Sequence, residues 1–262
     1  MEFGLLGPLF VSDGSAVHAV SSGKQRALLA ALLLRAGWVV RAEQLIETLW
    51  DSRPPRSAEV TLRNYVVRLR KSIGAAGARI RTSSGGYVFE AADEEIDLRI
   101  FDGLRVRAES ALRAGDVESA GGMLDRALAL WRGPALADVV SLTLHRDLGP
   151  ALEEQRLHAV ELKLRAECAS GRSTAAIPEL LRLTAAHPWR ESLWGHLMVA
   201  YAQSGRQAEA LAVFRRVQRM LADELAIRPG AELAALHARI LAGDAVLPTS
   251  SPVLVGAPGR AG

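Results

Sequence analysis

Polar and cationic side chains gather on one face of a predicted helix over residues 57–73. On a helical projection that face carries Thr61, Asn64, Tyr65, Arg68 and Lys71, with Arg63 and Arg70 on its flanks. Arg and Lys neutralise phosphate groups, and Asn, Thr and Arg also reach base edges in the major groove. We therefore interpret the face as one that reads duplex DNA. A solvated charged face is the plainer alternative, but such a face usually mixes both signs, and here Glu59 is the one acidic residue.

Positive charge is concentrated around this helix. The whole sequence has 32 Lys and Arg against 29 Asp and Glu. Residues 1–93 carry twelve basic and eight acidic side chains, a balance of +4, whereas the remaining residues balance to −1. Within residues 57–81 six basic side chains stand against one acidic side chain. Such a basic patch is the electrostatic footprint of a nucleic-acid-binding region.

An apolar stripe anchors the other side of the helix. Its members follow one another at helical spacing: Ala58, Leu62, Val66, Leu69 and Ile73. Ser57 is a candidate N-cap, and the prolines at 54 and 55 end any helix that precedes it.

Short elements on both sides complete a small domain. Strand-like runs at 3–6, 9–11 and 16–20 predict an antiparallel sheet with a turn at Asp13-Gly14. Helices are expected at 25–35 and 42–49, joined by an extended link at 38–40. After the polar helix, strand-like runs at 79–82 and 87–89 flank a Ser-Gly turn and predict a β-hairpin. The order of sheet, three helices and hairpin predicts a winged helix-turn-helix.

These segments resemble the OmpR-type winged helix of the SARP family (Streptomyces antibiotic regulatory proteins). The resemblance rests on LLGPL, GKQRALLAALLLRAG, LIETLW, PPRSAEVTLRNYVVRLRK and SSGGYVF, and covers nearly all of residues 1–90. It implies that Arg68 contacts a base, that Asn64 and Tyr65 lie against base edges or phosphate, and that Arg70 and Lys71 bind phosphate. Many relatives have a basic or polar residue where this chain has Val67. The implied DNA-contacting set also includes Thr61, Arg63, Arg79, Arg81, Thr82, Gly86 and Tyr87.

The resemblance also implies a mode of action. Such proteins bind tandem direct repeats in double-stranded DNA as homodimers and recruit the RNA polymerase holoenzyme through its sigma and alpha subunits. The turn between the second and third helices is the expected polymerase-facing surface: Trp50, Asp51, Arg53 and Arg56. A mere connector is an equally good interpretation of this turn.

After a hinge at 94–97, the rest of the chain to about Gly243 is predicted to be helical. Sliding the chain by 34 residues maps Val160, Gly171, Ala176 and Leu180 onto Trp194, Gly205, Ala210 and Phe214, as in tetratricopeptide repeats. A weaker unit has Gly115, Ala120 and Leu124. Such helix pairs stack into a short superhelix with a concave face, or pack as a compact bundle. WRGPALADV, HPWRESLW, LMVAYAQSGRQAEAL and ELAIRPGAELAALHARIL resemble the bacterial transcriptional activation domain of SARP proteins over about residues 97–245.

Other classes of protein find little support. No run of about 18 apolar residues exists, so we expect no membrane span. The first residues lack the basic start of a signal peptide, and one cysteine, Cys168, allows no intrachain disulfide, which favours a cytoplasmic location. The six histidines form no H-x-x-x-H pair, G-x-S-x-G is absent, and Gly23-Lys24 lacks the rest of a phosphate loop. We expect neither an enzyme nor a cofactor or metal.

The predicted fold class is mixed: an N-terminal α+β winged helix-turn-helix, then an all-α, tetratricopeptide-like domain. The expected domains are a DNA-binding domain at 1–93, a transcriptional activation domain at 94–245 and a disordered tail at 246–262. Larger relatives continue with an NTPase, so we expect a small, stand-alone regulator. The predicted function is sequence-specific activation of a secondary-metabolite (antibiotic) biosynthetic gene cluster. The alternatives are a winged-helix repressor and a helical-repeat adaptor protein without sequence-specific DNA binding.

Overall fold

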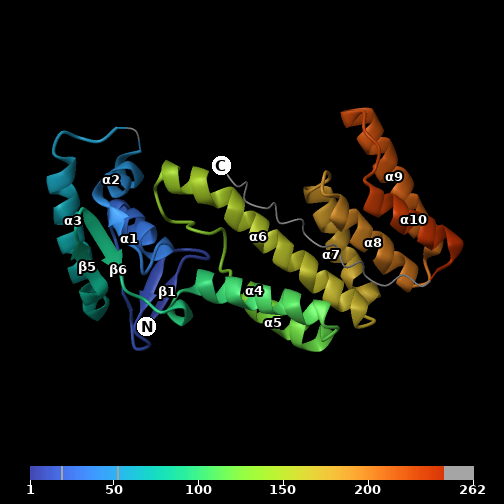
Figure 1. Ribbon diagram of the computed structural model, residues 1–262, viewed down its shortest axis with the longest axis horizontal. Coiled ribbons are helices and arrows are strands. Elements are labelled where there is room, and N and C mark those ends of the chain that lie inside the picture. Colours follow the sequence, from blue (N-terminus) through green and yellow to red (C-terminus); the bar gives the residue numbers. More distant parts are fainter. Residues whose placement is uncertain (19, 52, 245–262) are drawn as a thin grey trace, which may run out of the picture. The chain divides into compact units, whose positions relative to one another are not determined.

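A computed structural model describes residues 1–18, 20–51 and 53–244 (Figure 1). The chain divides into two compact units, the first containing Met1–Ala108 and Gly122–Val160 and the second containing Glu109–Gly121 and the residues from Glu161 onward. Packing therefore does not divide the chain at residue 93, and the boundaries 1–93 and 94–245 stay predictions about sequence domains. The predicted tail at 246–262 lies outside the described residues. None of the helices in the described ranges has the length and apolarity that crossing a bilayer requires.

A three-stranded antiparallel sheet opens the first unit, as predicted. It consists of β1 (Glu2–Gly4), β2 (Phe10–Ser12) and β3 (Val17–His18), in that order. The Asp13 carboxylate shapes the turn between β2 and β3, because it accepts the backbone N–H groups of Ser15 and Ala16 and the Ser15 hydroxyl. These bonds, with the Ser15 hydroxyl foremost, hold the pKa of Asp13 well below its usual range.

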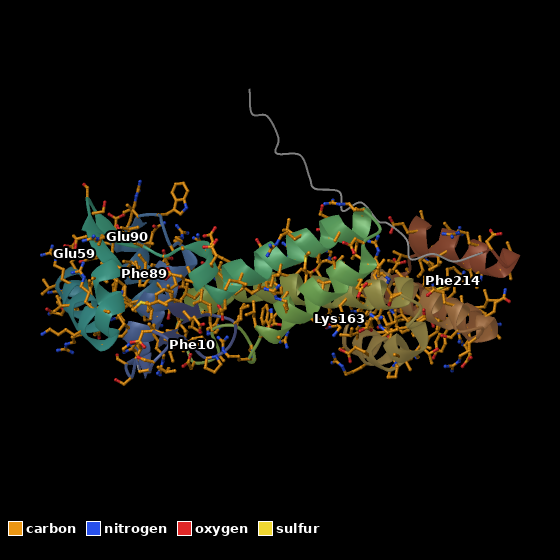
Figure 2. The ribbon with its side chains drawn as sticks, turned by 90° about the horizontal axis from the view of Figure 1, so that it is seen from below. Phe10, Glu59, Phe89, Glu90, Lys163 and Phe214 are labelled. Atoms are coloured by element: carbon orange, nitrogen blue, oxygen red, sulfur yellow. The ribbon has the colours of Figure 1, made fainter. Side chains whose placement is uncertain are left out.

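Three helices follow: α1 (Gly23–Leu34), α2 (Ala42–Trp50) and α3 (Ala58–Ser72). The predicted apolar stripe of α3 is confirmed, since all five of its members are at most 7% exposed. Six of the ten residues from Ala27 to Ala36 in and after α1 are completely buried, which makes α1 the centre of this core. Ser57 is the N-cap residue of α3, as predicted, although its side chain makes no capping hydrogen bond. In Figure 2, Glu59 lies at the outer side of α3 and Phe89 lies inside the unit.

The predicted hairpin is also present. A 3₁₀ turn, η1 (Gly74–Arg79), leads into β5 (Ile80–Ser83), which pairs with β6 (Gly86–Phe89) from Ile80↔Phe89 to Ser83↔Gly86. The link expected at 38–40 contributes a third strand, β4 (Val40–Arg41), which pairs with the other side of β6. The hairpin, called the wing below, is therefore tied back to the turn between α1 and α2.

A loop that is distant in sequence closes the first unit. Backbone N–H groups of Arg132, Leu136 and Ala137 donate to the carbonyls of Leu6, Leu5 and Gly7. The buried carboxylate of Asp97, at the start of α4 (Asp97–Arg113), accepts the N–H of Leu5 (2.7 Å) and of Leu6 (3.1 Å) and the Arg132 guanidinium (2.9 Å). The WRGPALADV motif thus binds the β1–β2 connection.

Helical repeats make up the second unit and extend into the first. The helices are α5 (Val117–Ala129), α6 (Leu142–Ala169), α7 (Ser173–Ala186), α8 (Glu191–Gln203), α9 (Gln207–Leu225) and α10 (Ala231–Ala242). Helices α7, α8 and α9 pack in sequence order, and α10 packs on α8 and α9 (Figure 1).

The predicted repeat is visible in equivalent positions. Gly115, Gly171 and Gly205 each end a helix with φ between +75° and +82°, where glycine avoids a Cβ clash. Ala176 in α7 and Ala210 in α9 occupy equivalent buried positions, one in each repeat. These features confirm an all-α tetratricopeptide-like region.

An internal ion pair fastens α6 to the start of α8. The carboxylate of Glu161 accepts Nε of Arg190 (2.7 Å), Nη2 of Arg190 (2.9 Å) and the Ser192 hydroxyl (2.7 Å). Burial alone would raise the pKa of Glu161, but these three bonds outweigh it and the pKa lies below its usual range. This gives the HPWRESLW motif a structural role, because it supplies both Arg190 and Ser192.

Candidate nucleic-acid interface

The outward face of α3 presents hydrogen-bonding side chains at steps of three and four. Asn64, Arg68 and Lys71 are exposed, and within the described part of the chain none of them has a hydrogen-bond or ion-pair partner. Thr61 is half-buried, with its hydroxyl 3.4 Å from that of Ser57. Because the opposite stripe of α3 is fully packed, the backbone that carries these groups is held rigidly. The face can donate hydrogen bonds to acceptors and balance negative charge without first breaking internal contacts.

Residues beside this stripe differ in how free they are. Arg63 lies 3.8 Å from Glu59, and both side chains are at least 70% exposed, so this pair restrains Arg63 only weakly. Val60 and Val67 are about half exposed, at 58% and 49%. An apolar side chain on such a face can contact a thymine methyl group, which the sequence interpretation did not consider. The sequence feature that could have indicated such a contact is a β-branched residue outside the buried stripe.

Arg70 joins α3 to the wing. Its Nε and Nη2 donate to the Ile80 carbonyl at 3.1 and 2.7 Å, and Nη2 also donates to the Thr82 hydroxyl at 3.0 Å. Gly77 permits the close approach, because a Cβ there would lie 2.0 Å from the Arg70 carbonyl oxygen. Arg70, a predicted phosphate contact, and Thr82, a predicted DNA contact, are therefore already hydrogen-bonded to each other.

The cations of the wing have acidic partners. Arg81 lies 3.2 Å from Glu90, and both are more than half exposed. Arg79 is paired with Glu95, which lies in a short 3₁₀ turn, η2 (Asp93–Glu95), and its guanidinium also lies over the Phe3 ring. The hydrogen bond from Arg79 is the main reason that the pKa of Glu95 is lowered to about 2. The wing thus offers less free positive charge than its sequence suggests.

Two predicted contact residues are buried. Gly86 lies against β4, where a Cβ would be 2.1 Å from the Val40 carbonyl oxygen. Tyr87 is 9% exposed and belongs to the core of the first unit. Packing therefore accounts for both residues, and neither presents a side chain to an external ligand.

The turn between α2 and α3 is fixed at its start. Trp50 stacks on Tyr65 with ring centroids 6.0 Å apart, so Tyr65 is half-buried. Asp51 adopts φ +53°, and its carboxylate accepts the backbone N–H of Thr143 (3.0 Å) and the Thr143 hydroxyl (2.9 Å). The side chains of Arg53 and Arg56 are exposed and have no partner among the described residues. The start of the turn is therefore held in place, and the turn presents two cationic side chains that have no internal partner in the described part of the chain.

A shallow hollow separates the end of α3 from the wing. It has a volume of about 580 Å³, and Arg70, Lys71 and Arg81 contribute to its lining. Three cations around one hollow suit a phosphate group, and the stripe on α3 suits base edges.

Family models match most of the chain. The model described as "Bacterial transcriptional activator domain" matches residues 96–241, and the model described as "Transcriptional regulatory protein, C terminal" matches residues 19–89.

Several characterised proteins are similar over nearly the whole chain. Regulatory protein AfsR of Streptomyces griseus is 42% identical over 93% of this chain, and transcriptional regulatory protein EmbR of Mycobacterium tuberculosis is 41% identical over 92%. The chain spans a quarter of the length of AfsR and 63% of that of EmbR. Regulatory protein DnrI of Streptomyces peucetius is 34% identical, over 96% of both chains.

A solved structure has the same fold. The structure of Mycobacterium tuberculosis EmbR in complex with a low-affinity phosphopeptide matches with a TM-score of 0.88 and 39% identity. The match covers 93% of this chain and 65% of that chain.

Proposed function

Because the chain belongs to the SARP family of transcriptional regulators, we propose that it binds duplex DNA through α3 and the wing and activates transcription. In this proposal it acts in the cytoplasm, as a homodimer on tandem direct repeats, at the promoters of an antibiotic biosynthetic gene cluster. The family itself consists of regulators rather than enzymes.

One observation carries the DNA-binding proposal. Asn64, Arg68 and Lys71 form an exposed stripe without internal partners on a helix whose other face is completely packed. A merely solvated helix face would be expected to carry acidic partners for its cations at i ± 3 or i ± 4. Arg63 has such a partner in Glu59, whereas Arg68 and Lys71 have none in the described part of the chain.

Recruitment of RNA polymerase is the second part of the proposal. It is supported by the match to the transcriptional activator domain and by the anchored turn that exposes Arg53 and Arg56. The turn lies at the opposite end of α3 from the hollow beside the wing, so polymerase and phosphate contacts need not compete.

Substitution of Arg68 tests the DNA-binding proposal. Footprinting on DNA flanking its own gene supplies the cognate site, and fluorescence anisotropy then measures the affinity for that site and for random DNA. We expect Arg68→Ala to lose about 1–3 kcal/mol at the cognate site, with a much smaller loss on random DNA. Arg215→Ala, which removes an exposed arginine from α9, is the matched control and should leave both affinities unchanged. Equal affinity of the Arg68 variant and the parent for the cognate site would refute base reading by α3.

Transcription in vitro separates the activator from the repressor. With purified holoenzyme and the footprinted promoter, the protein should raise transcript yield, and Arg68→Ala should abolish the rise. A fall in yield would identify a repressor. Absence of any footprint would favour the adaptor hypothesis.

A further inference from the structure

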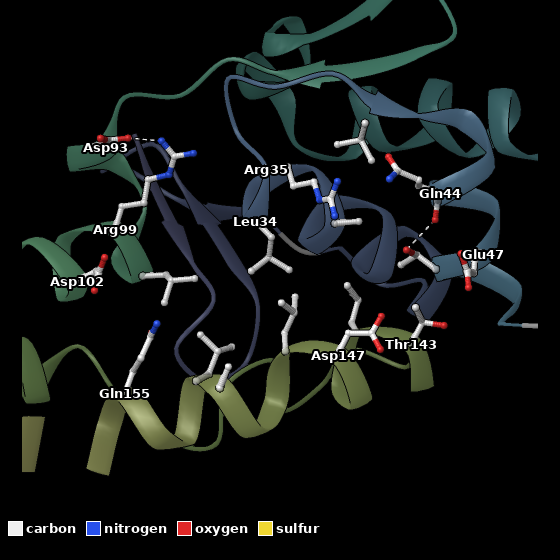
Figure 3. Close-up of a pocket in the computed structure, with 18 of the residues that line it drawn as sticks. Leu34, Arg35, Gln44, Glu47, Asp93, Arg99, Asp102, Thr143, Asp147 and Gln155 are labelled. Atoms are coloured by element: carbon white, nitrogen blue, oxygen red, sulfur yellow. Dashed lines mark hydrogen bonds and ion pairs between the residues drawn. The ribbon is translucent and has the colours of Figure 1, made fainter. Parts of the chain in front are cut away.

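A cleft of about 740 Å³ lies inside the first unit, and no residue of α3 lines it (Figure 3). Its walls come from α1, α2, the start of α4 and the first half of α6. Leucines 34, 98, 144, 148 and 152 give it an apolar floor, and the Gln155 amide projects into it from α6. Ten polar or charged residues line the rest of the cleft. Clefts of about 300–1,000 Å³ that combine apolar surface with placed polar groups are typical small-molecule sites.

Most charged groups around the cleft are already paired. Arg99 binds Asp93 and donates to the Ala36 carbonyl, Asp102 binds Arg105, and Asp147 binds Arg146. The charge of Glu47 acts on the same Arg146, although less strongly than Asp147 does.

Arg35 and Glu47 are the exceptions, because neither side chain has a hydrogen-bond or ion-pair partner within the described ranges. Arg35 follows α1, and its side chain points into the cleft (Figure 3). An unpaired guanidinium above an apolar floor is suited to a carboxylate, which it can bind with two parallel hydrogen bonds.

We propose that the cleft binds a small amphipathic carboxylic acid, with its apolar body on the leucine floor and its carboxylate on Arg35. The site is distinct from the DNA-binding and polymerase-contacting surfaces proposed above. Its occupant would also touch Thr48 and Thr143, which line the cleft. The Thr48 carbonyl accepts the Ser141 hydroxyl, and the Thr143 hydroxyl donates to Asp51 at the start of the α2–α3 turn. Ligand binding in the cleft is therefore linked to the position of that turn.

The structure offers a matched pair of blocking variants. Gly103 lines the cleft within α4, and Gly122 is an exposed glycine within α5 that does not line it. A Cβ at either glycine meets nothing within 4 Å, so the backbone has room for a side chain at both, and leucine has a higher helix propensity than glycine. Only Gly103→Leu places an added side chain in the cleft.

The test uses the neutral fluorescent probe N-phenyl-1-naphthylamine on the full chain. We expect saturable binding with one site per chain, abolished in Gly103→Leu and retained in Gly122→Leu. Displacement by 1-naphthylacetate and by 1-naphthylmethylamine then compares an acid and an amine with the same apolar body. The acid should compete roughly tenfold better, and Arg35→Gln should remove that preference without removing probe binding. Equal probe binding by the two leucine variants would overturn the site. A preference for the amine, or an acid preference that survives Arg35→Gln, would overturn the proposed ligand chemistry.

Discussion

Removal of the Asp97 carboxylate should separate the N-terminal sheet from the helices that follow it. The side chain is 7% exposed and accepts three hydrogen bonds, two from the backbone of Leu5 and Leu6 and one from Arg132. Asp97→Ala leaves all three donors without their acceptor. Since the Leu5 and Leu6 side chains are completely buried, water has little access to their N–H groups.

The size of the loss follows from these bonds. A hydrogen bond to a charged group contributes about 1.5–3 kcal/mol, and breaking a buried ion pair by removing one partner costs about 3–5 kcal/mol. The Arg132 side chain is 35% exposed and can be resolvated in the variant. We therefore expect Asp97→Ala to lower the free energy of unfolding by about 3–5 kcal/mol, at the lower end if the β1–β2 connection relaxes.

Urea unfolding followed by tryptophan fluorescence measures this loss, and Asp102→Ala is the matched control. Asp102 also lies on α4 and also pairs with an arginine, but it is 51% exposed. Arg105 is 17% exposed, so the pair is half-exposed as a whole, and such an i, i+3 pair contributes about 1 kcal/mol or less. Equal destabilisation by the two variants, or a loss below about 1 kcal/mol for Asp97→Ala, would refute the argument that this carboxylate holds the unit together.

Three further perturbations address the wing and the turn. Arg81→Ala should weaken binding to all DNA sequences and reduce the slope of log affinity against log salt by about one; an unchanged slope would remove the wing from the DNA contacts. The pKa of Glu95 is lowered from 4.5 to about 2, so its ion pair with Arg79 stabilises the fold above pH 4.5 and ceases to do so as the pH falls toward 2. Glu95→Gln should therefore cost about 1 kcal/mol at pH 7 and nothing near pH 2, and urea titrations that give a constant difference would contradict this. Asp51→Ala removes both hydrogen bonds to Thr143 and leaves an alanine at φ +53°, where those bonds no longer offset the backbone strain. Transcription in vitro should therefore fall, while DNA affinity should stay within about twofold. An equal fall in DNA affinity would assign the turn to DNA binding instead.

Sequence periodicity was sufficient to predict the elements that carry the candidate site. The stripe from Ala58 to Ile73 specifies which side of α3 is buried, and so which side is left for Asn64 and Arg68. Gly171 and Gly205, 34 residues apart, likewise mark equivalent turns between helices. Such features are local, because a helix or turn repeats its own burial pattern along a few residues.

Pairings between distant segments could not be predicted in the same way. No sequence pattern near Arg132 predicts that it binds Asp97, and none near Val40 predicts that it pairs with Tyr87. Arg70 and Arg68 are two residues apart and of one type, yet Arg70 binds the wing and Arg68 is free. An arginine satisfies a carbonyl, a carboxylate or a phosphate with the same donors, so its role depends on what the fold places beside it.

DNA affinity should come mainly from those cations of α3 and the wing that have no firm internal partner. Arg68 and Lys71 have no internal partner in the described chain, so a phosphate or base gains their full interaction. Arg81 must first leave Glu90, but both side chains are more than half exposed, and such a pair is worth at most about 1 kcal/mol. Arg79 is more firmly held, because its partner Glu95 is only 19% exposed and also lies 3.5 Å from the N-terminal ammonium group. The salt-dependent part of the DNA affinity should therefore come from Arg68, Lys71 and Arg81, whereas Arg79 stabilises the fold through its ion pair with Glu95.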